Sequence, residues 1–158
     1  MTATKERIAT LPPRFFVRTA WVLHRALLRF SGGRIGLTRP KAGTKFGMMR
    51  LTTVGRRSGQ PRVAIVGYYE DGPNLGALAM NGWAEAEPAW RLNLQAQPET
   101  VVELKDGPRA VRGRAADGED RARLWARWRE FSDNYDGWAE IRSGEMAVVV
   151  LEPRTSIP

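Results

Sequence analysis

One short segment of this sequence carries three arginines around a tight turn between two apolar runs. The segment, residues 55–62, reads GRRSGQPR, although Asn-Gly or Asp-Gly would be enough to close a hairpin. Guanidinium groups and the backbone N–H groups of a Gly-Ser turn together bind phosphate or carboxylate groups well. The segment therefore predicts an anion site built from Arg56, Arg57, Ser58 and Arg62. The alternative is an ordinary solvated turn, since loops lie at the surface.

A second candidate site follows a predicted strand, at residues 79–95, which read AMNGWAEAEPAWRLNLQ. Pro88 suits the first position of a helix, and a helix N-terminus offers free amides to an anion or a polarised carbonyl. The preceding loop, Asn81, Gly82, Trp83 and Ala84, could support a flat ring against its backbone. Trp83 and Trp90 are also suited to a hydrophobic core, and for Trp90 on a helix face we favour the core.

A third candidate lies among the aromatic residues near the C-terminal end. Residues 133–139 read DNYDGWA, and their Asn, Asp and Gly content indicates a loop that holds Tyr135 and Trp138. Binding residues lie on loops more often than the number of loop residues would predict, so we predict that this loop forms a lid over a planar substrate. Trp125 and Trp128 precede it on one face of an expected helix, which should pack against the sheet.

The composition excludes several other kinds of site. The sequence has no cysteine and a single histidine, His24, so disulfides, thiolate metal sites and most histidine metal sites are excluded, and we expect no metal. The net charge is +8, but residues 1–50 hold eleven Lys or Arg and one acidic residue, so the rest of the chain is almost neutral. A basic arm rich in aliphatic residues on a neutral body argues against nucleic acid as the partner.

The N-terminal arm contains an expected amphipathic helix over residues 13–30. Its arginines, Arg14, Arg18, Arg25 and Arg29, share one stripe at the α-helical period. The apolar run is too short to span a bilayer and lacks the features of a signal peptide. The helix either lies on an anionic membrane or docks on its own domain or on a partner subunit, as in a homodimer. We expect a cytoplasmic protein, with peripheral attachment to the inner face of the membrane under the first alternative.

Short runs rich in β-branched residues follow the arm, and turn signals separate many of them. The expected strands are Phe46–Val54, Arg62–Glu70, Leu75–Ala79, Thr100–Leu104, Arg109–Ala115 and Met146–Glu152. Such tight hairpins imply antiparallel pairing. We predict one α+β domain in which about six strands form a small barrel or half-barrel. Helices from Pro88 and after Asp117 interrupt the strands, and the expected division is an arm over residues 1–45 and a barrel over residues 46–158.

Three motifs in this order resemble the deazaflavin-dependent nitroreductase family. They are LTTVGRRSGQPRV at residues 51–63, NGWAEAEPAWRLNLQAQPETVVEL at residues 81–104 and MAVVVLEP at residues 146–153. The resemblance spans about residues 46–153 and implies a split β-barrel, similar to FMN-binding barrels, that uses reduced coenzyme F-420.

The resemblance also implies a division of roles among the residues. The coenzyme carries a phosphodiester and an oligoglutamate tail, which the family binds with the hairpin matching Arg56, Arg57, Ser58, Gln60, Pro61 and Arg62. Ring binding is implied for Met80, Asn81, Gly82, Trp83, Ala84, Trp90 and Asn93. Tyr135, Trp138 and Gly67 fall where the family places the substrate, with Tyr135 as a candidate proton donor.

The implied reaction is hydride transfer from C5 of the reduced ring to a planar electrophile such as a quinone, an enone or a nitroaromatic. In such a reaction the cofactor supplies the chemistry, while the protein orients the reactants and excludes water. The chain departs from the family at Met80-Asn81-Gly82-Trp83, where SKGG is common, and at Gly67, where relatives often have an aromatic residue. These departures leave two alternatives: an FMN-dependent split-barrel oxidoreductase, and a non-catalytic barrel that binds a lipid or small ligand at the membrane.

Overall fold

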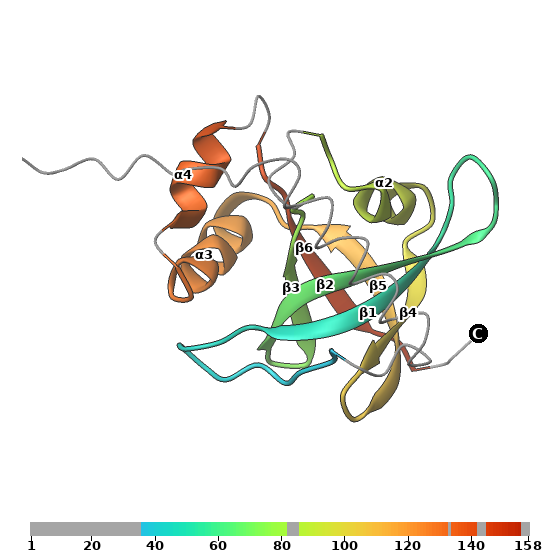
Figure 1. The fold of residues 1–158 in the computed structure, drawn as a ribbon, viewed down its shortest axis with the longest axis horizontal. Coiled ribbons are helices and arrows are strands. Elements are labelled where there is room, and N and C mark those ends of the chain that lie inside the picture. The colour runs from blue at the N-terminus through green and yellow to red at the C-terminus, as the bar shows by residue number, and fades with distance from the viewer. Residues whose placement is uncertain (1–35, 82–85, 133, 142–144, 156–158) are drawn as a thin grey trace, which may run out of the picture.

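A computed structural model of the chain describes residues 36–81, 86–132, 134–141 and 145–155 (Figure 1). Its strands are β1 (Gly47–Val54), β2 (Pro61–Asp71), β3 (Asn74–Leu78), β4 (Glu99–Leu104), β5 (Gly107–Ala115) and β6 (Val148–Pro153). Its helices are α2 (Ala89–Ala96), α3 (Gly118–Arg129) and α4 (Asn134–Ile141). Each expected strand is present, with ends that differ by no more than two residues from the expected bounds.

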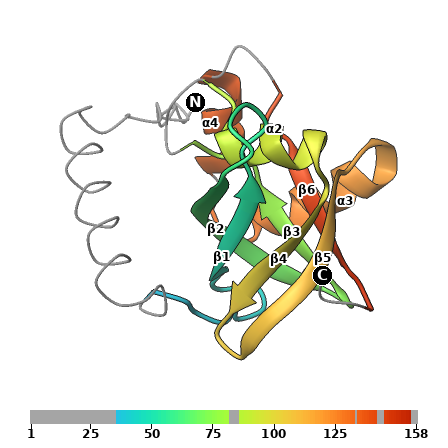
Figure 2. The same cartoon turned by 90° about the vertical axis from the view of Figure 1, so that its right-hand side faces the viewer.

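The six strands form a closed barrel in the order β1-β2-β3-β6-β5-β4, and every neighbouring pair is antiparallel. Figure 2 shows β1, β4 and β5 side by side on one wall of this barrel. Closure leaves no strand edge exposed to pair with another chain. The expectation of a small antiparallel barrel is therefore confirmed.

The strands alternate between the interior and the outside of the barrel. In β1 every second residue is buried, among them Met49 and Leu51, as expected for side chains that point to opposite faces with a period of two. Helix α2 adds Trp90 and Leu94 to the same interior cluster. Its apolar face is thereby buried against the barrel interior, and the cofactor-ring role implied for Trp90 has to be compatible with this packing.

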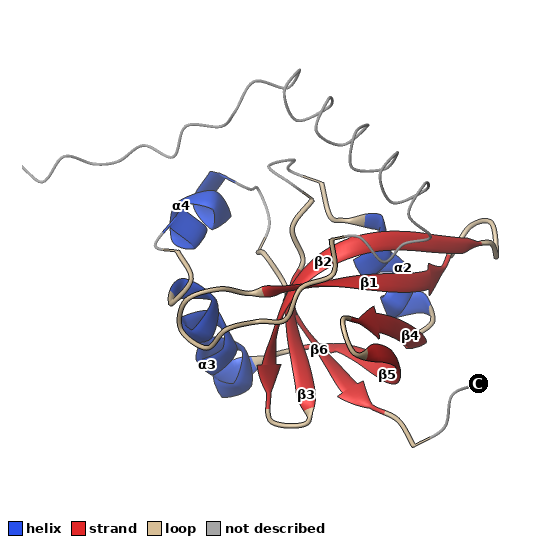
Figure 3. Ribbon diagram, turned by 60° about the horizontal axis from the view of Figure 1, so that its bottom comes forward, coloured by secondary structure: helices blue, strands red, loops and turns tan. Residues whose placement is uncertain are grey.

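Helices α3 and α4 cover part of the outside of the barrel, away from α2 (Figures 1 and 3). They bury a second apolar cluster against outward-facing residues of β2, β3 and β6. The buried members are Tyr69, Leu78, Ala116, Leu124, Trp128, Tyr135, Met146, Val148 and Val150. The aromatic rings of this cluster meet mostly at steep angles, such as Trp128 and Tyr135 with centroids 5.6 Å apart and planes at 70°. Such edge-on contacts favour a fixed arrangement of rings.

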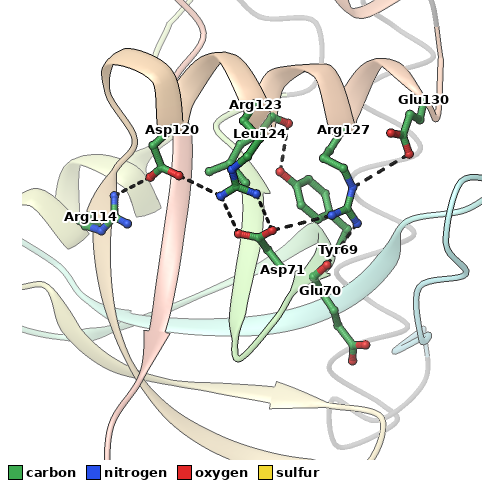
Figure 4. Close-up of polar contacts among 9 residues, drawn as sticks. All are labelled: Tyr69, Glu70, Asp71, Arg114, Asp120, Arg123, Leu124, Arg127 and Glu130. Carbon is green, nitrogen blue, oxygen red and sulfur yellow. Dashed lines mark hydrogen bonds and ion pairs between the residues drawn. The ribbon is translucent and has the colours of Figure 1, made fainter.

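Hydrogen-bonded ion pairs attach α3 to the turn between β2 and β3 (Figure 4). Arg123 donates to both carboxylate oxygens of Asp71, at 2.7 and 2.9 Å, and also to Asp120 at 2.9 Å. Arg127 lies 4.7 Å from the centre of the Tyr69 ring, and the Tyr69 hydroxyl donates to the carbonyl of Leu124. The bonds from Arg123 hold the pKa of Asp71 below its usual value, so the carboxylate is charged at neutral pH.

The loop expected around Tyr135 and Trp138 is instead the helix α4, so the expectation of two helices after the arm was wrong: the described residues contain three. The Asn, Asp and Gly residues disfavour a helix by only about 1 kcal/mol each at most, and packing against α3 outweighs this. Asp136 accepts a hydrogen bond from Trp125 Nε1 at 2.8 Å and pairs with Arg129 at 2.9 Å.

Several expectations concern residues outside the described ranges. These are the amphipathic helix over residues 13–30, including His24, and the loop residues Gly82, Trp83 and Ala84. At the start of the described chain, Thr38 and Met48 exchange backbone hydrogen bonds of 3.1 and 3.0 Å. None of the helices in the described ranges is long and apolar enough to cross a membrane.

Candidate functional site

The arginine-rich turn joins β1 to β2 and has a defined backbone geometry. Gly59 N–H donates to Gly55 O at 2.7 Å, and Gly55 N–H donates to Gln60 O at 2.8 Å. Gly59 has φ of +67°, a region that favours glycine. At Gly55 a Cβ would lie 2.7 Å from Ser58 Oγ and 3.1 Å from the backbone carbonyl oxygen of Gln60, so a larger residue would shift the turn. Both glycines are therefore required by the turn.

The three arginines of this turn are exposed and have no carboxylate partner in the part of the chain that the structure describes. Arg56, Arg57 and Arg62 form no ion pair with any described residue, although every other described arginine except Arg109 does. Ser58 Oγ accepts hydrogen bonds of 3.3 Å from Arg62 Nη2 and from Gln60 N–H. The turn thus gathers uncompensated positive charge, which is the chemistry that an anionic ligand requires.

Asn93 of α2 holds this turn in place through hydrogen bonds of its side chain. Its side chain is 3% exposed, and Oδ1 accepts a hydrogen bond from Arg56 N–H at 3.1 Å while Nδ2 donates to Thr53 Oγ1 at 3.0 Å. The guanidinium of Arg56 also approaches Oδ1, at 3.5 Å. Figures 1 and 3 show the tip of the β1–β2 hairpin beside α2. Both polar groups of Asn93 are bonded to the hairpin, so Asn93 positions the turn; its contact with a cofactor stays a prediction.

A cavity of about 150 Å³ lies against β2, between α2 on one side and α3 and α4 on the other. It is lined by Phe46, Ile65, Val66, Gly67, Leu78, Met80, Trp90, Trp128 and Tyr135. Four of these, Gly67, Met80, Trp90 and Tyr135, are residues for which the resemblance implied contacts with ring or substrate. The fold brings them together from β2, the end of β3, α2 and α4.

This cavity is small, and it is open to solvent on one side. An apolar cavity of about 150 Å³ accommodates a benzene-sized ring, whereas pockets for larger ligands measure roughly 300–1,000 Å³. The described part of the cavity therefore fits a single aromatic or quinoid ring, and a tricyclic ring system would have to extend beyond it.

Tyr135 is the titratable side chain that lines the cavity. It is 5% exposed, and burial raises the pKa of its hydroxyl above the ordinary value of 10. The hydroxyl forms no hydrogen bond with any described residue, while the ring packs edge-on against Trp138, with centroids 5.2 Å apart. Tyr135 therefore holds a proton at neutral pH beside the cavity, and Trp138 supports its ring from behind.

The turn and the cavity lie along the same strand. Successive strand residues rise about 3.3 Å, so Arg62 and Gly67 are about 17 Å apart along β2. Between them Val63 and Ile65 point out of the barrel on the same side as Gly67, and Val63 is 51% exposed. Arg62 pairs with the buried Thr53 and therefore projects from the opposite face of β2, so the outer row of Val63 and Ile65 connects the cavity to the end of the turn and not to the Arg62 side chain.

The sequence did not reveal every cavity residue. Five of the cavity residues were expected only as strand or helix residues: Phe46, Ile65, Val66, Leu78 and Trp128. The alternation in β1 and β2 could have placed Phe46 and Ile65 on the outer face, but nothing in the sequence shows that this face adjoins a cavity. Among the ring-binding loop residues, Met80 lines the cavity and Asn81 is half-buried, while the next three residues lie outside the described ranges.

The fold and the site together define a small β-barrel with an arginine-rich hairpin and an aromatic cavity. Residues 21–153 match the family model described as F420H(2)-dependent quinone reductase. A quinone reductase of that name from Mycobacterium tuberculosis is 34% identical over 137 residues, which cover 84% of this chain and 89% of the relative. A second relative from the same organism, described as putative, is 30% identical over 99 residues, 63% of this chain and 83% of the relative. The chain belongs to this family.

Solved structures support the same fold. An F-420-H2-dependent reductase aligns with a TM-score of 0.60 at 24% identity, over 66% of this chain and 93% of its own. A protein described as a domain-swapped dimer aligns with a TM-score of 0.63 at 23% identity, over 85% of this chain and 99% of its own. At these identities the likeness concerns the fold alone.

Proposed function

We propose that the β1–β2 hairpin of this chain binds the anionic part of coenzyme F-420 and that the cavity on β2 binds the ring of a quinone. Family membership makes the chain an oxidoreductase that depends on reduced F-420 and reduces quinones. The division of the site between coenzyme and quinone is the proposal. The observation that carries it is the set of three arginines that form no ion pair with any described residue, at one end of a strand whose middle lines an aromatic cavity.

The residues of the hairpin fit the coenzyme. A phosphodiester and an oligoglutamate tail are acceptors of hydrogen bonds only, and Arg56, Arg57 and Arg62 supply donors in the forked geometry that suits them. Ser58, Gln60 and Pro61 shape the turn. Met80 and Trp90 line the cavity. By family pattern they would contact the ring system of the coenzyme together with Asn81, Gly82, Trp83 and Ala84. Such a donor set does not by itself separate F-420 from FMN, and the family favours F-420.

When bound, reduced F-420 supplies a hydride. Reduction of a quinone to a hydroquinone requires two electrons and two protons, so one proton must come from an acid in addition to the hydride. Tyr135 is neutral and buried beside the cavity, and we assign it as the donor of this proton to a quinone oxygen. The apolar walls exclude water, which strengthens the interactions that orient the ring. One-ring enones and nitroaromatics are further proposed acceptors.

A titration with F-420, followed by fluorescence, tests the hairpin assignment. Changing Arg56 and Arg57 together to Ala should weaken binding by about 2–4 kcal/mol, since a hydrogen bond between charged groups contributes ~1.5–3 kcal/mol and the losses are not additive. This corresponds to a rise in Kd of about 30-fold to several hundred-fold. Arg109→Ala is the matched control, because Arg109 also lacks an ion pair with a described residue but lies on β5. Equal affinities in the double variant and the wild type would refute the assignment.

We further propose that residues 13–30 attach the protein to the inner face of the cytoplasmic membrane through their arginine stripe. Each arginine near an anionic surface contributes about 1 kcal/mol. Removing residues 1–31 should abolish sedimentation with vesicles that contain anionic lipid and leave turnover in solution largely intact. Loss of turnover as well would show that these residues belong to the fold or the site. The domain-swapped relative supports a homodimer as a further proposal, which light scattering would test.

A further inference from the structure

Three side chains of α3, spaced four residues apart, contact the segment that holds Tyr135. They are Arg121, Trp125 and Arg129, and residues at this spacing share one face of a helix. Trp125 Nε1 donates to Asp136 Oδ1 at 2.8 Å, and Arg129 Nε lies 2.9 Å from Asp136 Oδ2. Asp136 of α4 is therefore held through both carboxylate oxygens by two residues of α3.

Arg121 holds the first of these partners in place. Its guanidinium lies 5.3 Å from the centre of the Trp125 ring, a cation–π contact that contributes about 0.5–1 kcal/mol at an exposed site. The same guanidinium donates to the carbonyl of Met146 at 2.9 Å and pairs with Glu145 at 3.0 Å. The indole of Trp125 is thus fixed by Arg121 as well as by its own bond to Asp136.

These contacts bear on the cavity because Asp136 is the neighbour of Tyr135 in α4. Tyr135 is 5% exposed and lines the cavity, and its hydroxyl forms no hydrogen bond with any described residue. Its ring makes edge-on contacts with Trp128 of α3 and Trp138 of α4, at centroid distances of 5.6 and 5.2 Å. In the described ranges, the polar contacts that attach α4 to α3 are made one residue away, by Asp136.

We propose that Asp136 is a positioning residue for the reaction: by fixing α4 on the stripe formed by Arg121, Trp125 and Arg129, it holds the hydroxyl of Tyr135 at the cavity. This inference rests on the proposed function, in which Tyr135 gives a proton to a quinone oxygen. Proton transfer requires donor and acceptor atoms about 2.6–3.2 Å apart, and a misplacement of about 1 Å can cost roughly 100-fold in rate. Asp136 therefore affects the rate without touching the substrate.

A double-mutant cycle on kcat tests whether Asp136 acts through Tyr135. Asp136→Ala removes both contacts with α3 and should lower kcat for a quinone by about tenfold, which a displacement well under 1 Å can cause, and leave the Kd of F-420 unchanged. In the Tyr135→Phe background the same substitution should change kcat by less than about twofold, because residues that act together are not additive. Equal losses in the two backgrounds, or no loss in the wild-type background, would overturn the proposal.

Conservative variants and a matched control separate the contacts of Asp136 from a general effect of charge. Asp136→Asn keeps an acceptor for Trp125 Nε1 and should recover part of the kcat that Asp136→Ala loses. Trp125→Phe removes only the N–H donor and should lower kcat less than Asp136→Ala. Glu140→Ala removes another carboxylate from α4, one that is exposed and forms no ion pair with any described residue, and should keep the wild-type kcat. A kcat as low in Glu140→Ala as in Asp136→Ala would contradict the assignment.

Nitration of tyrosine gives a readout that does not depend on turnover. The chain has three tyrosines, and Tyr68, Tyr69 and Tyr135 are 1%, 1% and 5% exposed, so tetranitromethane should modify all of them slowly in the wild type. In Asp136→Ala the nitration rate at Tyr135, followed by mass spectrometry of its peptide, should rise at least about tenfold because α4 opens locally more often. Tyr68 and Tyr69 should react as slowly as before, which reports an intact barrel.

The two readouts can fail separately. If Tyr135→Phe reduces quinones at the wild-type rate, the proposed function of Tyr135 fails, and nitration still decides whether Asp136 holds Tyr135 in place. If all three tyrosines react quickly, Asp136→Ala does not fold, and the same measurement on Trp125→Phe, which keeps an aromatic ring at this position, decides instead. An unchanged nitration rate at Tyr135 in a folded variant would refute the inference.

Discussion

Replacing Asn93 by Leu should loosen the arginine-bearing hairpin without touching a charged residue. Asn93 joins α2 to the hairpin through Arg56 N–H on one side and the Thr53 hydroxyl on the other. Leucine has a similar volume but offers neither an acceptor nor a donor. The substitution therefore removes both links and leaves their partners in place.

The expected loss follows from what becomes of those partners. Thr53 is 2% exposed, so its hydroxyl loses a hydrogen bond in a place that water does not readily reach. Arg56 is exposed and its N–H can bind water again. At about 1–3 kcal/mol for each hydrogen-bonding group left without its partner, the sum is about 2–4 kcal/mol, the Arg56 share being the smaller. For a domain of this size that lowers Tm by roughly 5–15 °C.

Two measurements separate positioning from stability. Calorimetry gives Tm, and a fluorescence titration gives the Kd of F-420 at a temperature at which the variant is fully folded. Asn93→Leu should raise Kd at least about tenfold and leave kcat at saturating coenzyme unchanged. Thr53→Val is the matched control, because it removes the bond to Asn93 Nδ2 and the 3.4 Å bond to the Arg62 carbonyl but keeps the bond from Arg56 N–H to Asn93; it should lower Tm with a smaller rise in Kd than Asn93→Leu.

The reasoning is wrong if Asn93→Leu lowers Tm as expected but binds F-420 as tightly as wild type. Asn93 would then stabilise the fold without organising the arginines. Asn93→Asp gives a further check. It keeps an acceptor for Arg56 N–H but adds a carboxylate beside the guanidinium, so it should weaken coenzyme binding while Tm stays nearer to wild type than in Asn93→Leu.

Two further predictions concern the opposite side of the barrel. Tyr135→Phe should lower kcat for a quinone by about 100-fold, the lower end for a proton-transfer group, and leave the Kd of F-420 unchanged. Because burial raises the pKa of Tyr135 above 10, the wild-type rate should show no loss from tyrosine ionisation below that pH. An undiminished kcat in the variant would remove Tyr135 from the mechanism. Asp71→Asn should flatten the acid side of the stability curve, measured as Tm against pH. The pKa of Asp71 is lower in the folded state than in the unfolded state. Its contribution to stability is therefore complete above about pH 4 and is lost as the pH falls through the folded-state pKa. Parallel curves of Tm against pH for variant and wild type would contradict this.

The barrel could be predicted from the sequence because its signals are local. Turns such as Asp71-Gly72-Pro73-Asn74 mark where strands end, and alternating burial follows from the strand period, so the strand positions need no knowledge of distant residues. The position of the arginine-rich turn could be predicted for the same reason.

The cavity and α4 could not be predicted because they depend on distant contacts. Helix α4 is stabilised by the hydrogen bond from Trp125 and the ion pair with Arg129 that Asp136 makes with α3. These contacts outweigh the preference of its own residues for a turn. The role of Asn93 likewise depends on its meeting the hairpin in space. The sequence did not identify Phe46 as a cavity residue, because its role depends on contact with Gly67, which lies twenty-one positions later on the neighbouring strand.

The place of β6 in the barrel has a consequence for synthesis of the protein. This strand, the last described one along the chain, lies between β3 and β5. During translation the edges of β3 and β5 that face it therefore lack hydrogen-bond partners until residues 148–153 emerge. Such a nascent barrel is open along one seam, and the chaperone demand of this domain should be highest before residues 148–153 emerge. A ribosome stalled short of residue 148 would carry a chain prone to pair with the same strand from another ribosome.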